Sequence, residues 1–341
     1  MTRPAAPVAV LGAGSWGTAL AIHLAGAGGS PRLWGRDRAL IERIGAAREN
    51  PRYLPGLAVP VGVTATADPR AALDGAATVI VAVPSAFVES VVGAVRGCVS
   101  ASAAVVSATK GLEPGRGRRI SVLLGECLPG RPIAVLSGPS FAREVALGRP
   151  TALVVASADE GLARDLQRGL AGPALRLYTN RDVIGVEIAG ALKNVMAVAT
   201  GLSDGIGLGE NARAALITRG LAEIARLGVA LGAQPGTFLG LAGLGDLVLT
   251  CTGSLSRNHA LGRAVAGGRT VAAVQAETPM VAEGARTVGA ALGLSRSAGI
   301  RMPICEEVAA VLFDGKPVAD ALRSLLSRDP RPEDEEEARR S

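Results

Sequence analysis

A glycine-rich turn between a strand-like and a helix-like segment constrains the fold of this chain more than any other feature. Val8–Leu11 is a short apolar run, residues 12–17 follow it, and 17–27 have the pattern of a helix. Glycine at Gly12, Gly14 and Gly17 allows a tight turn, close approach of the backbone to a pyrophosphate, and close helix packing. Because a helix start favours anions and no Walker sequence is present, we predict a nicotinamide dinucleotide site rather than a nucleotide triphosphate site.

The alternation of strands and helices continues through the first half of the chain. Short runs rich in β-branched residues lie at 31–34, 78–83, 103–107, 133–136 and 151–156. Helix-like segments lie between most of them. This alternation predicts an α/β fold with a Rossmann-like, doubly wound and mostly parallel sheet.

The pattern changes close to residue 182. Beyond it we find only helix-like segments, at 182–200, 211–228, 238–249, 257–266, 281–292 and 303–314. A length of 341 residues predicts about two domains. We therefore expect a dinucleotide-binding domain at 1–180 and an all-α, substrate-binding domain at 181–327. Residues 328–341 combine prolines with a charge run and no apolar face, which predicts a flexible, solvated tail.

Composition excludes several classes of protein. Hydrophobic residues make up 48% and charged residues 19% of the chain, which excludes disorder over most of it. No uninterrupted apolar run reaches the roughly 18 residues of a membrane span, so we expect a cytoplasmic protein without stable membrane insertion. The four cysteines are scattered without a Cys-x-x-Cys pair, which argues against a disulfide framework and a zinc site, and we expect no metal.

The net charge of +6 comes almost entirely from arginine, since the only lysines are Lys110, Lys193 and Lys316. An excess of basic residues is explained by solubility alone or by a preference for phosphorylated small molecules. Nucleic acid is not expected as a partner, because the arginines are dispersed and aromatic residues make up only 2%.

The residue about 20 positions beyond the glycine-rich turn indicates the type of cofactor. Sheets that bind NAD carry an acidic residue there, which holds the ribose, whereas this strand ends in Gly35-Arg36-Asp37. A guanidinium binds a 2′-phosphate with two hydrogen bonds, so Arg36 predicts NADPH, with NADH as the alternative. In the other interpretation Arg36 is a loop residue beside Asp37.

Two further turns follow predicted strands, where open α/β sheets bind ligands. Lys110 lies in the first turn, and Gly138, Ser140 and Ala142 lie in the second. Taken singly, Lys110 is equally explained as a surface lysine, and the second segment as an ordinary turn.

Lys193 lies in a predicted helix that is apolar nearly all round. A buried lysine is costly unless it is paired or used, and burial brings its pKa toward the range of general acid and base chemistry. The alternative is a lysine that extends its ammonium past apolar neighbours to the surface. The chain has only two histidines, His23 and His259, and His23 lies inside the first helix, which favours Lys193 as the proton donor.

A polar cluster follows Asp246 in the second half of the chain. Ser256 has the position of an N-cap, with Arg257 and Asn258 in the first helical turn, where free amides and the helix dipole favour an anion. The cluster therefore indicates a phosphate site. An ordinary capped helix with an exposed arginine gives the same pattern.

Together these segments resemble the NAD(P)-dependent sn-glycerol-3-phosphate dehydrogenases of the bacterial type. Five blocks occur in the order of that family, at 12–18, 107–111, 137–142, 191–194 and 255–258. The resemblance implies reduction of dihydroxyacetone phosphate to sn-glycerol 3-phosphate for glycerophospholipid synthesis, usually with NADPH. One departure is Glu210, where the family's pattern has aspartate.

The resemblance also implies roles for individual residues. Lys193 matches the family's proton-transferring lysine, and Asp246 is expected to stabilise its charged form. The implied cofactor contacts are Ser15, Trp16, Arg36, Lys110, Ala142, Arg257, Val281 and Glu283. The implied substrate contacts are Lys110, Gly138, Ser140, Lys193, Asp246, Ser256, Arg257 and Asn258.

Two other functions stay open at this point. A 3-hydroxyacid dehydrogenase would act on carboxylates without requiring a phosphate. A catalytically silent regulator would bind NADPH tightly and turn over no triose phosphate. The assembly also stays open, with a homodimer as one alternative.

Overall fold

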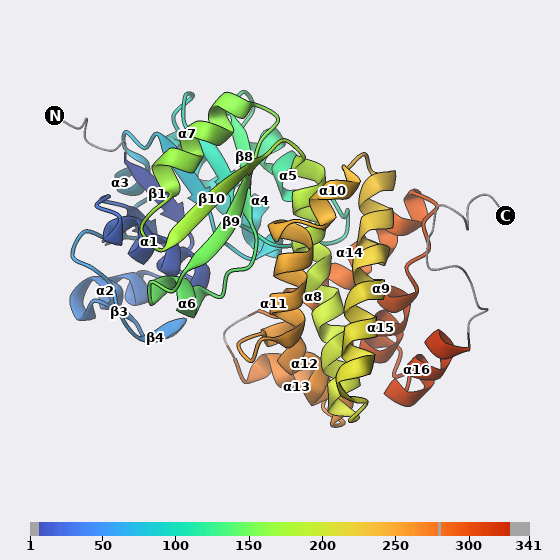
Figure 1. Cartoon of the computed structure of the whole chain (residues 1–341). Coiled ribbons are helices and arrows are strands. Elements are labelled where there is room, and N and C mark those ends of the chain that lie inside the picture. The colour runs from blue at the N-terminus through green and yellow to red at the C-terminus, as the bar shows by residue number, and fades with distance from the viewer. Residues whose placement is uncertain (1–6, 279–280, 328–341) are drawn as a thin grey trace.

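The computed structural model describes residues 7–278 and 281–327, and a sheet-containing part and a helical part lie side by side in it (Figure 1). The tail predicted for 328–341 lies outside the described residues.

An eight-stranded sheet forms the first part. Its strands are β1 (Val8–Leu11), β2 (Arg32–Trp34), β5 (Thr64–Thr66), β6 (Thr78–Val81), β7 (Ala104–Ser107), β8 (Ile133–Ser137), β9 (Thr151–Ala156) and β10 (Leu175–Asn180). Their order is β10-β9-β8-β7-β6-β1-β2-β5, and every neighbouring pair is parallel except β8 with β9. The predicted Rossmann-like, mostly parallel sheet is confirmed.

Helices cover both faces of this sheet. They are α1 (Ser15–Gly26), α2 (Arg38–Ala47), α3 (Pro69–Leu73), η1 (Ser85–Phe87), α4 (Val88–Val95), η2 (Arg96–Cys98), α5 (Ile120–Cys127), α6 (Ala142–Ala146) and α7 (Glu160–Leu170). Successive strand residues point to opposite faces. Val10 therefore belongs to the apolar cluster of α1, α2 and α7, whereas Ala9 and Leu11 belong to the cluster of α3, α4 and α5. Burial on both faces explains why these strands read as continuous apolar runs.

A small hairpin interrupts the alternation after α2. Its strands, β3 (Glu49–Asn50) and β4 (Leu54–Ala58), pair antiparallel outside the main sheet. The sequence did not predict this hairpin, because β3 consists of only two polar residues and β4 contains a proline and a glycine.

Helices form the described remainder of the chain. They are α8 (Val183–Gly205), α9 (Gly209–Ala230), α10 (Pro235–Phe238), the π-helical turn η3 (Leu241–Gly245), α11 (Asp246–Thr252), α12 (Arg257–Ala266), α13 (Val271–Ala276), α14 (Glu283–Ser297), α15 (Pro303–Phe313) and α16 (Val318–Leu326). Helix α8 lies at the centre, and α9, α11, α12 and α14 pack against it. It is long and apolar enough to cross a membrane by length and composition, but 89% of its apolar window is buried inside the protein. That burial makes α8 the core helix of this part.

Glycines let α8 and α12 approach each other closely. A Cβ atom at Gly201 would lie 2.1 Å from the carbonyl oxygen of His259, and one at Gly262 would lie 2.2 Å from that of Val198. The two backbones are therefore in direct contact. This contact holds the first turn of α12 beside the middle of α8, where Lys193 lies.

The predicted helix at 238–249 is wrong as a single element. The chain forms α10, η3 and α11 in its place. A Cβ atom at Gly243 would lie 2.1 Å from the carbonyl oxygen of Phe238, so the glycines permit a backbone contact that a regular helix does not make. The break places Asp246 in the first turn of α11.

Candidate active site

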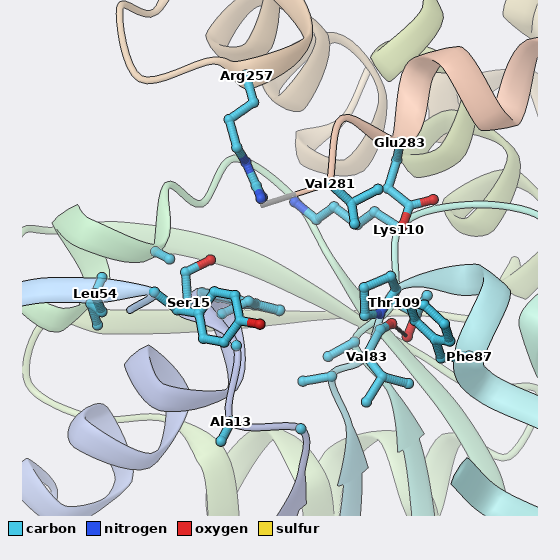
Figure 2. Close-up of a pocket in the computed structure, with 18 of the residues that line it drawn as sticks. Ala13, Ser15, Leu54, Val83, Phe87, Thr109, Lys110, Arg257, Val281 and Glu283 are labelled. Carbon is cyan, nitrogen blue, oxygen red and sulfur yellow. Dashed lines mark hydrogen bonds between the residues drawn. The ribbon is translucent and has the colours of Figure 1, made fainter. Parts of the chain in front are cut away.

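A cavity of about 720 Å³ lies between the two parts of the molecule. In Figure 2, Arg257, Val281 and Glu283 extend over it from the helical part, opposite Ala13 and Ser15 of the sheet part. The predicted site residues on its wall are Gly12, Gly14, Ser15, Trp16, Arg36, Lys110, Ser140, Ala142, Lys193, Ser256, Arg257, Asn258, Val281 and Glu283. The cavity therefore brings together residues that are far apart in the sequence.

Gly17, Gly138 and Asp246 are predicted site residues that lie behind this wall. Gly17 packs against Gly12, while Gly138 and Asp246 accept hydrogen bonds from Lys110.

The glycine-rich turn has the shape that a pyrophosphate needs. Gly12 has φ +119°, and a Cβ atom there would lie 2.5 Å from the carbonyl oxygen of Ala82. A Cβ atom at Gly17 would lie 1.9 Å from the carbonyl oxygen of Gly12, whereas one at Gly14 would meet nothing within 4 Å. Two glycines are thus required by the packing, and the third leaves the space over the helix start open.

The start of α1 offers unused hydrogen-bond donors to that space. Gly14 is the N-cap of α1, so no side chain caps the helix. The Trp16 Nε1 atom is buried and has no partner among the described residues. Free amides and the helix dipole suit a diphosphate. We conclude that the cradle fits a dinucleotide.

Asp37, at the far end of the cavity, is engaged in the protein's own structure. It is the N-cap of α2, and its Oδ1 atom accepts a hydrogen bond of 3.0 Å from the amide of Leu40. Arg36 extends beside it, with its Cζ atom 5.2 Å from the centre of the Phe87 ring. The guanidinium of Arg36 therefore lies on the cavity wall, as the NADP interpretation requires.

A buried carboxylate joins two lysines in the middle of the site. The Nζ atom of Lys193 donates to Oδ1 of Asp246 at 2.5 Å, and the Nζ atom of Lys110 donates to Oδ2 at 2.8 Å. Asp246 is completely buried. Lys110 comes from the turn after β7, whereas Lys193 and Asp246 come from α8 and α11. Both parts of the chain thus contribute to one ionic cluster.

The turn after β8 completes the surroundings of Lys110. The Nζ atom of Lys110 also donates to the carbonyl oxygen of Gly138 at 2.6 Å and to Oγ of Ser140 at 3.0 Å. Gly138 has φ +126°, a conformation that favours glycine, and it turns this carbonyl toward the lysine. The interpretation of Lys110 as a plain surface lysine is therefore wrong.

Lys193 is buried, so the interpretation in which it extends to the surface is wrong too. Its side chain is only 7% exposed. The pKa of Lys193 is lowered to about 8, chiefly by burial; the charge of Asp246 opposes this shift, and the nearby charge of Lys110 adds to it. The ammonium also donates to Oγ1 of Thr250 at 2.8 Å. This amine loses its proton far more readily than an exposed lysine does.

Amide side chains join the elements around the two lysines. The Nδ2 atom of Asn194 donates to the carbonyl oxygen of Lys110 at 3.3 Å, and Asn258 donates to Oδ1 of Asn194 at 2.9 Å. Oδ1 of Asn258 accepts from the amide of Gly284 at 2.9 Å. These bonds connect α8, α12 and α14, so Asn258 has a structural role in addition to its predicted contact with substrate.

The first turn of α12 faces the cavity. Ser256 is its N-cap, and the Ser256 hydroxyl accepts from the amide of His259 at 3.3 Å, as predicted. Arg257 extends from this turn into the cavity (Figure 2). A helix start and a guanidinium thus lie together beside Lys193.

Glu283, at the start of α14, contacts the sheet part across the cavity. Its carboxylate accepts from the Ser85 hydroxyl at 2.7 Å and from the Ser85 amide at 3.3 Å. Burial raises the pKa of Glu283, and the two bonds from Ser85 oppose that shift. Glu283 therefore holds the edge of the cavity together.

The two histidines do not line the cavity. The Nε2 atom of His23 lies 2.9 Å from the carbonyl oxygen of Leu170, and that of His259 lies 2.7 Å from Oδ2 of Asp204. This placement leaves Lys193 as the candidate proton donor.

Roles for Thr250, Asn194 and Asn50 were not predicted from the sequence. Thr250 follows Asp246 by four residues, which places both on one face of a helix, but the helix predicted at 238–249 hid this spacing. Asn50 is fully buried in the hairpin that the sequence did not predict.

Comparisons with known proteins place this arrangement in a family. A model of the NAD-dependent glycerol-3-phosphate dehydrogenase N-terminus matches residues 7–163, and one of the C-terminus matches 182–323. The chain is 48% identical, over 98% of both chains, to a glycerol-3-phosphate dehydrogenase of Stenotrophomonas maltophilia (strain R551-3). It is 49% identical to one of Nitratidesulfovibrio vulgaris (strain DP4), over 96% of this chain and 99% of the relative.

A solved structure agrees with both the sequence match and the fold. The crystal structure of glycerol-3-phosphate dehydrogenase from Coxiella burnetii superposes with a TM-score of 0.92 at 40% identity, over 96% of this chain and all of that one. The sheet, the helical part and the sequence agree with the same group of proteins over nearly the whole chain, and we conclude that it belongs to the NAD-dependent glycerol-3-phosphate dehydrogenase family.

Proposed function

We propose that this protein reduces dihydroxyacetone phosphate to sn-glycerol 3-phosphate with NAD(P)H, and so supplies the backbone of glycerophospholipids. The observation that carries this proposal is the Lys110–Asp246–Lys193 cluster beside a dinucleotide cradle. The curated relatives, at 48–49% identity, bear the same activity in their names.

The charge of the cluster suits a phosphorylated substrate. Two ammonium groups share one carboxylate, so the cluster keeps a net positive charge in a buried place. Arg257 and the first turn of α12 add a guanidinium and free amides nearby. We assign the substrate phosphate to Ser256, Arg257 and Asn258, because a helix start with an arginine favours a dianion.

Lys193 is the proton donor in this proposal. A nicotinamide dinucleotide held by the glycine-rich turn and the start of α1 would supply the hydride for the carbonyl carbon. The ammonium of Lys193 gives a proton to the carbonyl oxygen as negative charge develops there, which leaves the amine neutral. Asp246 and Thr250 hold the Nζ atom at 2.5 and 2.8 Å, so the direction of its remaining N–H bond is fixed.

Lys110 and Asp246 position the reacting groups. Asp246 accepts one hydrogen bond from each lysine and keeps the two ammonium groups at a fixed separation. Gly138 and Ser140 hold Lys110 from the other side. Preorganised charges of this kind require no reorientation during the reaction, which is where much of the rate enhancement of enzymes arises.

The cofactor is NADPH, with NADH as the alternative. Arg36 lies on the cavity wall where the 2′-phosphate would lie, and the Asp37 carboxylate is already used to cap α2. The contacts assigned to the cofactor are Ser15, Trp16, Arg36, Lys110, Ala142, Arg257, Val281 and Glu283.

A direct assay tests the proposed function. The loss of NADPH absorbance is followed with dihydroxyacetone phosphate, with dihydroxyacetone, and with a 3-keto carboxylate, and the product is identified by mass spectrometry. We expect turnover of dihydroxyacetone phosphate and at most a trace with dihydroxyacetone, because the phosphate supplies remote binding energy. Preferred turnover of the carboxylate would favour a hydroxyacid dehydrogenase, and NADPH binding without any turnover would favour a regulator.

We also propose that the enzyme works in the cytoplasm. The apolar helix α8 is the core of the helical part, which supports a protein that needs no membrane. Light scattering after size-exclusion chromatography would distinguish a monomer from a homodimer, the alternative noted above.

A further inference from the structure

The β3–β4 hairpin brings a second arginine to the far end of the cavity. Arg52 lies in the turn of this hairpin and lines the cavity together with Arg36 and Asp37. It comes from a separate segment, 16 positions after Arg36 in the sequence.

Asn50 fixes the hairpin to the glycine-rich turn. Its Nδ2 atom donates to the carbonyl oxygen of Ala13 at 2.9 Å and to Oγ1 of Thr18 at 2.8 Å. Its Oδ1 atom accepts from the amide of Tyr53 at 3.1 Å. Because Asn50 is completely buried, these bonds hold the residues beside Arg52 at a set position relative to the dinucleotide cradle.

Arg52 is held next to Asp37 while remaining accessible. Its Nη1 atom lies 3.2 Å from Oδ2 of Asp37, and its Cζ atom lies 5.3 Å from the centre of the Tyr53 ring. Both partners of the ion pair are about half exposed, at 52% and 47%. Such a pair is weak in water, so a phosphate dianion can compete for the guanidinium.

We propose that Arg52 is a second determinant of the preference for NADPH, acting on the 2′-phosphate together with Arg36. The end of β2 is where a Rossmann sheet meets the adenosine ribose, and Arg36, Asp37 and Arg52 all line the cavity there. The carboxylate of Asp37 repels a 2′-phosphate, and the positive charge of Arg52 in the ion pair offsets that repulsion. This inference rests on the proposed function only in taking NADPH as the cofactor.

Calorimetry with small probes tests the proposal without any turnover. Adenosine 2′,5′-bisphosphate carries the 2′-phosphate and adenosine 5′-monophosphate lacks it. We titrate both into wild type, Arg52→Ala, Arg36→Ala and, as the matched control, Arg38→Ala. Arg38 is an exposed arginine of the same segment that does not line the cavity.

We expect Arg52→Ala to weaken binding of the bisphosphate by roughly tenfold, the size of one charge-assisted hydrogen bond at an exposed site. Binding of the monophosphate should change much less, so that the ratio of the two affinities falls. Arg36→Ala should behave likewise, and Arg38→Ala should leave the ratio as in wild type. Arg52→Lys should recover part of the loss, because it keeps the charge but not the two-pronged geometry.

Three outcomes would overturn the proposal. They are an unchanged ratio in a folded Arg52→Ala protein, an equal loss for both probes, and an equal change of the ratio in Arg38→Ala. Thermal unfolding of each variant shows whether it is folded. If Arg52→Ala does not fold, the ratio of the two affinities is measured in Arg52→Lys instead. Failure to reduce dihydroxyacetone phosphate would count against the proposed function alone, since no substrate enters these titrations.

Discussion

Asp246 is the residue on which the site depends most. It has no contact with solvent and accepts from both Lys110 and Lys193, so its two oxygens set the spacing of the two ammonium groups. Its loss would leave the buried ammonium of Lys193 and the partly buried ammonium of Lys110 without a counter-ion, and an unpaired buried charge costs several kcal/mol in comparable cases. A change at Asp246 therefore confounds stability with catalysis, and the proton-transfer role is better tested at Lys193.

Arginine at position 193 is the sharper test of proton donation. It keeps a positive charge near Asp246 but holds its proton too tightly to act as a general acid near neutral pH. We expect Lys193→Arg to lose roughly a hundredfold or more in kcat while NADPH binding, measured by fluorescence, persists. A folded Lys193→Arg enzyme with near-normal kcat would leave Lys110 or water as the proton source.

The depressed pKa of Lys193 predicts opposite pH profiles for the two directions of the reaction. Reduction needs the protonated amine and oxidation needs the neutral one, and the pKa of Lys193 is lowered to about 8. We therefore expect kcat for reduction to fall above about pH 8 and kcat for oxidation of sn-glycerol 3-phosphate to rise through the same range. If kcat for reduction and kcat for oxidation changed in the same direction through this pH range, the ionisation would belong to another group.

The same pKa also affects stability. Between pH 8 and the ordinary lysine value of 10.5, the unfolded chain holds more protons at position 193 than the folded protein does. The contribution of Lys193 to the free energy of unfolding should therefore rise with pH across that window. Urea unfolding of wild type and Lys193→Met at several pH values measures this difference.

Residue types indicated the site better than they indicated its contacts. The apolar helix around Lys193 was sufficient to expect burial, and Ser256 was recognisable as a cap. The bond from Lys193 to Thr250 was not predicted, because it spans 57 positions and depends on where α11 begins. Arg52 gave no signal in the sequence, since its place is set by the bonds of Asn50.

Among the elements, the contact of α8 with α12 positions the candidate phosphate site. Gly262→Ala would place a methyl group 2.2 Å from the carbonyl oxygen of Val198 and so force the helices apart. We expect a loss of about 1–3 kcal/mol in the free energy of unfolding and a raised KM for dihydroxyacetone phosphate. Gly289→Ala is the control, because a Cβ atom there meets nothing within 4 Å in the middle of α14, and alanine should stabilise it by up to about 1 kcal/mol. Equal effects of the two changes on KM would contradict this account.

Helices and strands with a regular pattern of apolar residues were predictable, and elements whose regular backbone is interrupted were not. Helix α12 begins and ends at the predicted residues, and the central strands differ by at most two positions. The segment 238–249 carries the right composition for a helix, yet the close contact of Gly243 with Phe238 breaks it. Such a contact depends on the rest of the fold, which local propensity does not contain.

At the scale of the whole molecule, a buried carboxylate joins the two parts at a distance from the lysine cluster. Glu187 of α8 accepts from the Ser121 amide at 2.7 Å, from the Ser121 hydroxyl at 2.5 Å and from Arg119 at 2.8 Å. Glu187→Ala removes the acceptor of all three hydrogen bonds, and we expect the free energy of unfolding to fall by about 3 kcal/mol. Glu160→Ala, which breaks only exposed pairs with Arg164 and Arg181, should cost less than about 1 kcal/mol.

Two optical signals show whether Glu187 also couples the unfolding of the parts. Both tryptophans, Trp16 and Trp34, lie in the sheet part, so tryptophan fluorescence follows the unfolding of that part. The helices beyond residue 182 contain no tryptophan, and their unfolding is followed by circular dichroism. In wild type we expect the two urea transitions to coincide, and in Glu187→Ala to separate. Coincident transitions in the variant would mean that the remaining contacts are sufficient for coupling.

The division of the lysine cluster between the two parts has a consequence for recombination between relatives. A chimaera joined at residue 181 inherits Lys110 from one parent and Lys193 with Asp246 from the other. The largest apolar clusters of the two halves still come almost entirely from one parent each. The 2.8 Å bond from Lys110 to Asp246 must nevertheless form across the new junction. Hybrids should therefore fold more often than they work, and the active ones should be those whose parents share the residues that set the angle between the halves.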